Sequence, residues 1–351
     1  MTTIAAVHGV LGAHSYPQDE LTEMFARLCL PDNDGKAAVA RRLHASTTVA
    51  TRHLALPLES YPDLHGFTEA NEAFLSVAVD LGAQAVAGAL KEAGLDVADV
   101  DLIMSTTVTG IAVPSLDARI AGRLGLRPDV RRVPLMGLGC VAGAAGLARV
   151  HDYLLGAPDA VAVLVSVELC SLTVQRDDPS VANMVASGLF GDGAAAVVLT
   201  GAERDVPGPT IVGSRSHLYP DTERAMGWDV GSTGLRIVLG AEVPELVRQY
   251  LPGDVAGLLD EHGLTVADID PWICHTGGPK VIEAIEDVLD LPPDALALTW
   301  RSLREVGNLS SASVLHVLRD TLAARPPDGD GWGVLLAMGP GFCAELVLIR
   351  W

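Results

Sequence analysis

The segment GLDVADVD at residues 94–101 decides the fold, because the chain repeats it as GLTVADID at residues 263–270. The two copies start 169 residues apart, at 94 and 263. Each copy runs into an apolar, strand-like stretch, Leu102–Met104 in the first and Trp272–Cys274 in the second. A shared offset of this length indicates one duplicated unit rather than a short solenoid repeat.

A second pair of segments has nearly the same spacing. GCVAG at residues 139–143 and GNLSS at residues 307–311 each open a helix of small residues, and Cys140 lies 168 residues before Asn308. Two units related by a pseudo-dyad bring equivalent positions face to face. We therefore expect Cys140, Asn308 and the strand end that carries His275 to converge.

Strand-like runs alternate with helical patterns along the chain. Val161–Val165 and Ala194–Leu199 are apolar without interruption, as buried strands are, whereas residues 71–90 and 281–289 show helical periodicity. This alternation predicts an α/β fold. A stretch rich in Pro and Gly near residues 201–213 indicates the boundary, so we expect two halves, 1–203 with the cysteine and 204–351 with the histidine and asparagine.

The composition excludes several classes of protein. Apolar residues make up 49 % of the 351 residues and charged residues 19 %, which favours a folded core over disorder or a coiled coil. The excess of 44 acidic over 24 basic residues gives a net charge of −20. Proteins that bind nucleic acid usually carry a net positive charge, so the composition argues against this function. No apolar run approaches the ~18–20 residues of a spanning helix, and the N-terminus lacks a basic signal region. We expect a cytoplasmic protein with no nucleic-acid partner and no integral membrane association.

The cysteines point to one reactive thiol. There are five, widely spaced and without a CxxC pair, which argues against disulfides and zinc. Cys140 follows a glycine-rich turn and precedes a helix, where unpaired N–H groups and the helix dipole favour a thiolate. We interpret the other four as structural, the usual state of a free cysteine. With His275 and Asn308, Cys140 forms a nucleophile, a base and a neutral donor, a set that thiol proteases also use.

Five motifs resemble, in order, those of the type III polyketide synthases, the chalcone synthase-like branch of the thiolase superfamily. They are GCVAG (139–143), LFGDGAA (189–195), HTGGP (275–279), GNLSSA (307–312) and GPGF (339–342). The resemblance implies an α/β, thiolase-like, five-layered αβαβα fold built from two duplicated halves with mixed sheets. It also implies an acyltransferase of secondary metabolism that needs no metal or cofactor and uses CoA thioesters as substrates.

The resemblance assigns roles to the three reactive residues. Cys140 would accept the acyl group, while His275 and Asn308 would hold the thioester carbonyl of malonyl-CoA and stabilise the enolate left by loss of CO2. His275 would also pair with Cys140 and keep it as a thiolate. The enolate would then extend the Cys140-bound chain by two carbons per cycle, before cyclisation.

Five further positions align with residues that shape the family's cavity. Phe190 matches a gatekeeping phenylalanine, and Ile237 stands at the partner gatekeeper position, where a smaller side chain leaves room for an aliphatic chain. Trp228 replaces a glycine of the plant enzymes, and Thr173 aligns with another cavity residue. Val108 stands where chalcone synthases have a threonine involved in cyclisation, so the mode of ring closure is open.

Other aligned residues concern binding partners. Val113 aligns with a residue that reaches into a neighbouring subunit, which implies a homodimer. Arg42 aligns with a CoA-binding arginine, and Lys280 follows the histidine loop. Two other CoA-binding lysines of the family are replaced here, by Val39 and Ser46, so the starter arrives either as acyl-CoA held by other groups or on an acyl-carrier protein.

Three functions remain open from the sequence. The first is a synthase that extends a fatty acyl starter with malonyl-CoA to an alkylresorcinol or alkylpyrone; its alternative within the class is a malonyl-primed tetrahydroxynaphthalene synthase, which segment 167–173 also resembles. Ile237 and Val108 favour the alkyl chain. The second is a single-step condensing enzyme like ketoacyl-ACP synthase III, against which the HTGGP and GPGF motifs argue. The third is a non-catalytic acyl-binding homologue, against which the intact reactive set argues.

Overall fold

The computed structural model describes residues 1–325 and 330–351, and its centre is one mixed sheet of nine strands. The strand order is β11-β12-β13-β8-β1-β7-β6-β4-β5. The strands are β1 (Thr2–Leu11), β4 (Val100–Thr106), β5 (Arg131–Leu135), β6 (Val161–Leu169), β7 (Asp192–Thr200), β8 (Thr210–Leu218), β11 (Ile269–Cys274), β12 (Trp332–Gly339) and β13 (Cys343–Arg350).

The order and direction of the strands confirm the duplication. In the first half β4 runs parallel to β6, which pairs antiparallel with β7, which pairs antiparallel with β1. In the second half β11, β12, β13 and β8 repeat these relations in the same order. The two half-sheets are joined where Thr2 and Thr3 of β1 pair with Ile211 and Thr210 of β8.

The repeated segment at residues 94–101 and 263–270 makes the same connection in both halves. Gly94 and Gly263 both have φ of +68°, which ends the preceding helix and turns the chain. In each copy the carboxylate of an aspartate then caps the short turn that follows. The Asp99 carboxylate accepts from the backbone N–H of Asp96 at 2.8 Å, and the Asp268 carboxylate accepts from the backbone N–H of Thr265 at 2.7 Å. These capped turns feed β4 and β11, as the sequence predicted.

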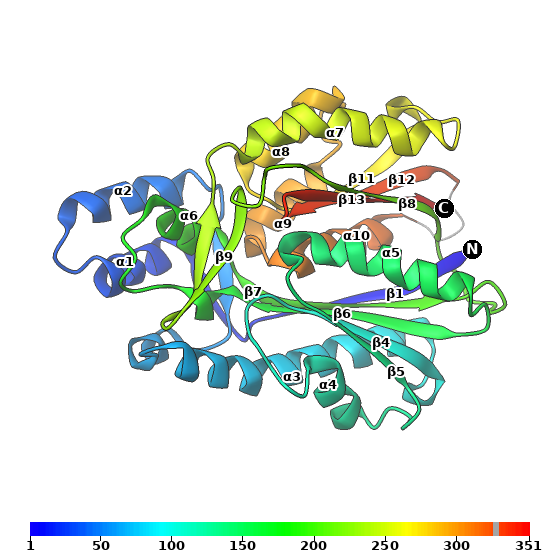
Figure 1. Cartoon of the computed structure of the whole chain (residues 1–351), viewed down its shortest axis with the longest axis horizontal. Coiled ribbons are helices and arrows are strands. Elements are labelled where there is room, and N and C mark those ends of the chain that lie inside the picture. Colours follow the sequence, from blue (N-terminus) through cyan, green and yellow to red (C-terminus); the bar gives the residue numbers. More distant parts are fainter. Residues whose placement is uncertain (326–329) are drawn as a thin grey trace.

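Helices cover both half-sheets and fill the space between them (Figure 1). The outer layers are α3 (Phe67–Ala93) with α4 (Leu116–Leu124), and α7 (Val243–Asp260) with α8 (Pro279–Leu289). The central layer holds α5 (Ala142–Leu155) and α10 (Ser313–Ala324), which contact strands of both halves. This is the expected αβαβα arrangement.

The two central helices approach closely because small residues face each other. A Cβ added at Gly143 in α5 would lie 2.3 Å from the carbonyl oxygen of Ser311, in the short turn η6 (Ser310–Ala312) before α10. Real Cβ atoms do not come that close to backbone oxygen, so the contact between the halves requires glycine at this position.

The remaining elements cover one end of the sheet. Helices α1 (Gln18–Cys29), α2 (Asp34–Ala45) and α6 (Val181–Leu189) pack together beside the hairpin β9–β10 (Met226–Gly231 and Gly234–Leu239) (Figure 1). A two-stranded antiparallel sheet of β2 (His14–Pro17) and β3 (Thr51–Leu54) completes this end, together with the turns η1 (Leu58–Asp63), η3 (Gly139–Val141) and η4 (Cys170–Thr173) and helix α9 (Ala297–Val306).

One helix corrects an expectation from the sequence. In α3, 27 residues long, an 18-residue window reaches a mean hydropathy of 1.6, so by length and composition alone the helix could cross a membrane. The structure gives the physical reason for that composition: α3 lies along β1, β6 and β7, and side chains such as Phe74, Ala85 and Val86 are fully buried against them.

Candidate active site

Cys140 lies at the junction of the two halves. It occupies η3, between β5 and the start of α5, and it is buried. Its Sγ lies 3.7 Å from the hydroxyl of Ser310, a residue of the second half. The thiol therefore faces the other half of the molecule, as the duplication predicted.

Asn308 is held in one orientation by its neighbours. Its backbone N–H donates to the Leu189 carbonyl, and its own carbonyl accepts from Gly191, both at 2.9 Å, so it is anchored beside Phe190. The Ser310 backbone N–H donates to Oδ1 of Asn308 at 2.8 Å, and the Ser313 hydroxyl lies 3.3 Å from the same atom. With Oδ1 engaged by donors, the amide nitrogen Nδ2 is the atom that faces His275.

His275 follows β11 and places its ring beside that amide. Its backbone N–H donates to Leu336 at 2.9 Å, and its Nε2 lies 3.5 Å from Nδ2 of Asn308. Nδ1 is buried without a hydrogen-bond partner among the described residues. A buried N–H without an acceptor is costlier than a bare lone pair, so this environment favours the tautomer with the proton on Nε2. Two donors, Nε2–H and Nδ2–H, then lie side by side.

The three groups line a single cavity of about 60 Å³, so the structure brings them together. Val108 lies in its wall, as do Leu239, Met338 and Phe342. Phe342 belongs to the GPGF motif, and its backbone N–H donates to the Thr222 hydroxyl at 2.8 Å. The wall is mostly apolar, which strengthens the electrostatic interactions inside it.

Burial controls the charge of the thiol and the imidazole. It raises the pKa of Cys140 to about 12, an effect that the hydrogen bond to Ser310 only partly opposes, and it lowers the pKa of His275 to about 4. The structure therefore differs from the thiolate expected at a helix N-terminus. Cys140 lies in η3, before α5 begins at Ala142, and burial there disfavours the charged thiolate.

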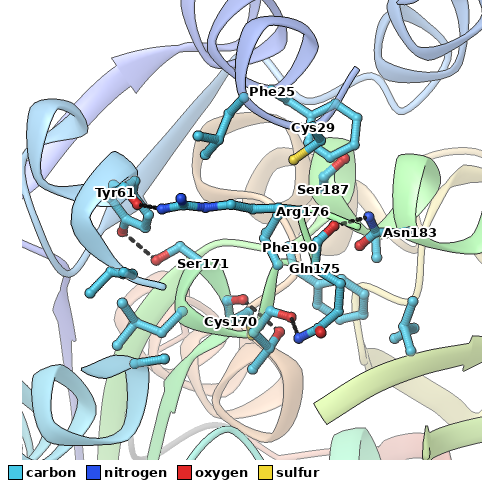
Figure 2. Close-up of a pocket in the computed structure, with 18 of the residues that line it drawn as sticks. Phe25, Cys29, Tyr61, Cys170, Ser171, Gln175, Arg176, Asn183, Ser187 and Phe190 are labelled. Carbon is cyan, nitrogen blue, oxygen red and sulfur yellow. Dashed lines mark hydrogen bonds between the residues drawn. The ribbon is translucent and has the colours of Figure 1, made fainter. Parts of the chain in front are cut away.

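A second cavity, of about 170 Å³, shares lining residues with the first and therefore adjoins it. Figure 2 shows the residues that line this second cavity. Both cavities are lined by Phe190, Trp228, Ile237 and Cys170, which form the wall between them. Thr173 lines the larger cavity only. Its other walls come from α1, η1, η4 and α6, and they combine apolar residues such as Phe25 with polar ones.

Three other residues chosen from the sequence lie outside both cavities. Arg42 and Lys280 are exposed and line neither cavity. Val113 is 92 % exposed, an unusual exposure for a valine.

Three residues at the site were not selected from the sequence. Cys170, interpreted as structural, lies in the wall of both cavities. Glu168 is fully buried beside the first cavity; it accepts from the Thr109 hydroxyl at 2.9 Å and from Ser311, and burial raises its pKa. Arg176 lines the second cavity. The only sequence signal for the first two was their position in segment 167–173.

A cavity formed between duplicated halves, with a thiol from one half and an imidazole and amide from the other, defines an acyltransferase of the thiolase type. Family models identify the group within that class. The model "Chalcone and stilbene synthases, N-terminal domain" matches residues 1–204, and "Chalcone and stilbene synthases, C-terminal domain" matches residues 210–351. The chain belongs to the chalcone and stilbene synthase family and is a type III polyketide synthase, an enzyme that condenses malonyl-CoA units iteratively.

Known relatives cover the whole chain. A 1,3,6,8-tetrahydroxynaphthalene synthase from Streptomyces peucetius subsp. caesius is 57 % identical over 100 % of this chain and 93 % of its own length. A phloroglucinol synthase from Pseudomonas fluorescens is 31 % identical over 100 % of this chain and 99 % of its own length. The crystal structure of 1,3,6,8-tetrahydroxynaphthalene synthase from Streptomyces coelicolor A3(2) superposes with a TM-score of 0.93 at 32 % identity, covering 99 % of both chains.

Proposed function

We propose that this synthase uses malonyl-CoA both as starter and as extender and forms 1,3,6,8-tetrahydroxynaphthalene. The observation that carries the proposal is the 57 % identity, over the full chain, with a protein of that name. It favours the malonyl-primed alternative over the fatty acyl starter, for which Ile237 and Val108 were the only signals.

The cavities support the same choice. A fatty acyl chain requires a long apolar channel, whereas Trp228 lies in the wall between the two cavities. Beyond that wall the larger cavity carries hydroxyl, amide and guanidinium groups from Ser171, Gln175 and Arg176. These groups suit a chain that bears a carbonyl on every second carbon, because each carbonyl oxygen accepts a hydrogen bond.

Cys140 is proposed to carry the growing chain. Its thiol must lose a proton before it attacks a thioester, and burial opposes an isolated charge there. Transfer of that proton to Nε2 of His275, with the ring in its other tautomer for this step, leaves the net charge of the cavity unchanged and creates two opposite charges that attract each other. The Cys140 sulfur then attacks the starter thioester carbonyl, and CoA leaves as its thiol after taking up the proton.

His275 and Asn308 are proposed to stabilise the enolate. With the thioester oxygen of malonyl-CoA held by Nε2–H and Nδ2–H, loss of CO2 leaves an electron pair that is delocalised onto that oxygen. A preorganised donor of this kind contributes about 3–4 kcal/mol to the transition state. The enolate carbon attacks the acyl carbon on Cys140, the C–S bond breaks, and the extended chain stays on CoA until it returns to Cys140.

The experiment is incubation of the purified chain with malonyl-CoA as sole substrate, followed by liquid chromatography with mass spectrometry. We expect tetrahydroxynaphthalene or its air-oxidation product, and no such product from Cys140→Ala. A second incubation adds acyl-CoA thioesters of increasing length. Products primed only by long acyl chains, with none from malonyl-CoA alone, would contradict the proposal in favour of the alkylresorcinol or alkylpyrone alternative.

Two further assignments belong to the proposal. Arg42 and Lys280 bind the CoA phosphates at the surface, where an exposed cation costs no desolvation. Val113 is covered by a second copy of the chain in a homodimer, since burying an exposed valine side chain contributes about 1.5–3 kcal/mol. Weaker malonyl-CoA binding in Arg42→Ala, and a dimer in sedimentation, are the expected results.

A further inference from the structure

Arg176 makes no ion pair with a carboxylate in the described part of the fold, although the exposed Asp177 beside it in sequence lines the same cavity. Its side chain extends across the larger cavity, between Cys29 and Ser171 (Figure 2). One guanidinium N–H donates to the Tyr61 backbone carbonyl, a neutral acceptor. Among residues 1–325 and 330–351, no Asp or Glu oxygen lies within 4.0 Å of Arg176, and its other N–H groups have no hydrogen-bond partner.

Two other charged groups near this cavity, Asp192 and Arg52, are engaged elsewhere. The Asp192 carboxylate accepts from the Ser171 backbone (2.8 Å), from the Ser171 hydroxyl and from the Ala55 backbone (2.7 Å). Arg52, the other arginine in this wall, is buried and donates to Gln18 (2.9 Å) and to the carbonyls of Ser187 and Phe190. Arg52 thus holds the wall together, whereas Arg176 keeps free donors that face the cavity.

From this geometry we infer that the larger cavity binds a carboxylate through Arg176, and that this carboxylate is the one a malonyl starter retains on Cys140. The inference rests on the proposed function. Only the starter unit keeps its carboxylate while the chain grows, because every extender loses CO2 before it forms a bond. The starter carboxylate is then lost as CO2 at or after ring closure, so that five malonyl units give the ten carbons of the product. A guanidinium offers a planar fork of donors that matches a carboxylate, and partial burial strengthens the pairing.

The position of Arg176 also fits the path of the chain. The two cavities share Cys170, Phe190, Trp228 and Ile237, so an acyl group on Cys140 that extends past this wall enters the larger cavity with its starter end first. Arg176 would therefore determine which starter is used, and it would leave decarboxylation of the extender to His275 and Asn308.

The test is a competition between starters. Purified full-length enzyme receives malonyl-CoA and hexanoyl-CoA at equal concentration, and mass spectrometry measures the ratio of malonyl-primed to hexanoyl-primed products. Because a hydrogen bond to a charged group contributes about 1.5–3 kcal/mol, we expect Arg176→Gln to lower this ratio about ten- to a hundredfold. Arg176→Leu, which keeps apolar packing in the wall, should lower it equally, and Arg176→Lys, which keeps the charge without the fork, should give an intermediate ratio.

Arg236→Gln is the matched control, because Arg236 lies next to Ile237 but lines neither cavity. It should keep the wild-type ratio. A folded Arg176→Gln or Arg176→Leu enzyme with an unchanged ratio overturns the inference. Wild-type enzyme that forms no malonyl-primed product overturns the proposed function itself, a result visible before any variant is made, and the inference falls with it.

Discussion

Replacing Asn308 by Ala removes one of the two donors that face the bound thioester oxygen. The amide nitrogen lies 3.5 Å from Nε2 of His275, and no other side-chain donor among the described residues makes a hydrogen bond to that ring nitrogen. Loss of a single preorganised donor of this kind lowers turnover about 10²–10³-fold. We therefore expect release of CO2 from malonyl-CoA to fall by that factor.

The same substitution also affects stability, which must be separated from catalysis. Oδ1 of Asn308 accepts from the Ser310 backbone N–H, and Ser310 is buried. An unsatisfied buried N–H costs about 1–3 kcal/mol, so the melting temperature should fall as well. Asn33→Ala is the matched control: Asn33 lines neither cavity, its Oδ1 caps α2 by accepting from the Lys36 backbone N–H at 3.0 Å, and loss of this cap costs about 1 kcal/mol.

The assay measures CO2 and acetyl-CoA formed from malonyl-CoA below the melting temperature of each variant. Asn33→Ala should decarboxylate at the wild-type rate, and Asn308→Ala should not. Wild-type decarboxylation in Asn308→Ala, with only the ring pattern of the product altered, would refute the enolate assignment and would leave Asn308 with a role in cyclisation.

The remaining predictions concern four other residues. Cys140→Ala should abolish product in mass spectrometry while circular dichroism stays unchanged, and full product yield would remove Cys140 as the acyl carrier. Trp228→Gly should join cavities of about 60 and 170 Å³ and admit bulkier starters, so an unchanged product profile would exclude Trp228 from the wall. Burial lowers the pKa of His44 from 6.5 to about 4, so the unfolded chain takes up this proton first and stability is lost as pH falls from 6.5 to about 4. His44→Gln should reduce the slope of unfolding free energy against pH by about 1.4 kcal/mol per unit in that window in denaturant titrations, and an unchanged slope would contradict the assignment. Val113→Asp should shift a dimer to monomer in sedimentation, and a persistent dimer would place the interface elsewhere.

The sequence predicted the features that depend on local patterns. The repeated segment at 94–101 and 263–270 has its own caps and turns, so it specifies the same geometry wherever it occurs. The convergence of Cys140 with His275 and Asn308 followed from the pseudo-dyad, and the structure places all three in one cavity.

Properties that depend on the whole fold could not be predicted in this way. The charge of Cys140 depends on how much water surrounds it, which helix position alone does not determine. The packing of α3 against the sheet is another such property, because an apolar helix that covers a sheet has the same composition as one that spans a membrane. Arg176 had no motif to mark it, since what distinguishes it is that its guanidinium lines a cavity without an ion pair in the described part of the fold.

The close contact between Gly143 and Ser311 means that a sequence change in one half of the molecule is limited by the structure of the other half. The first half cannot gain even a methyl group at position 143 unless the backbone of the second half at Ser311 moves away. The second half thus limits which substitutions the first half can accept at this contact. During synthesis on the ribosome, moreover, the thiol at position 140 emerges well before its partners at 275 and 308, so a nascent first half carries a cysteine that cannot yet do chemistry.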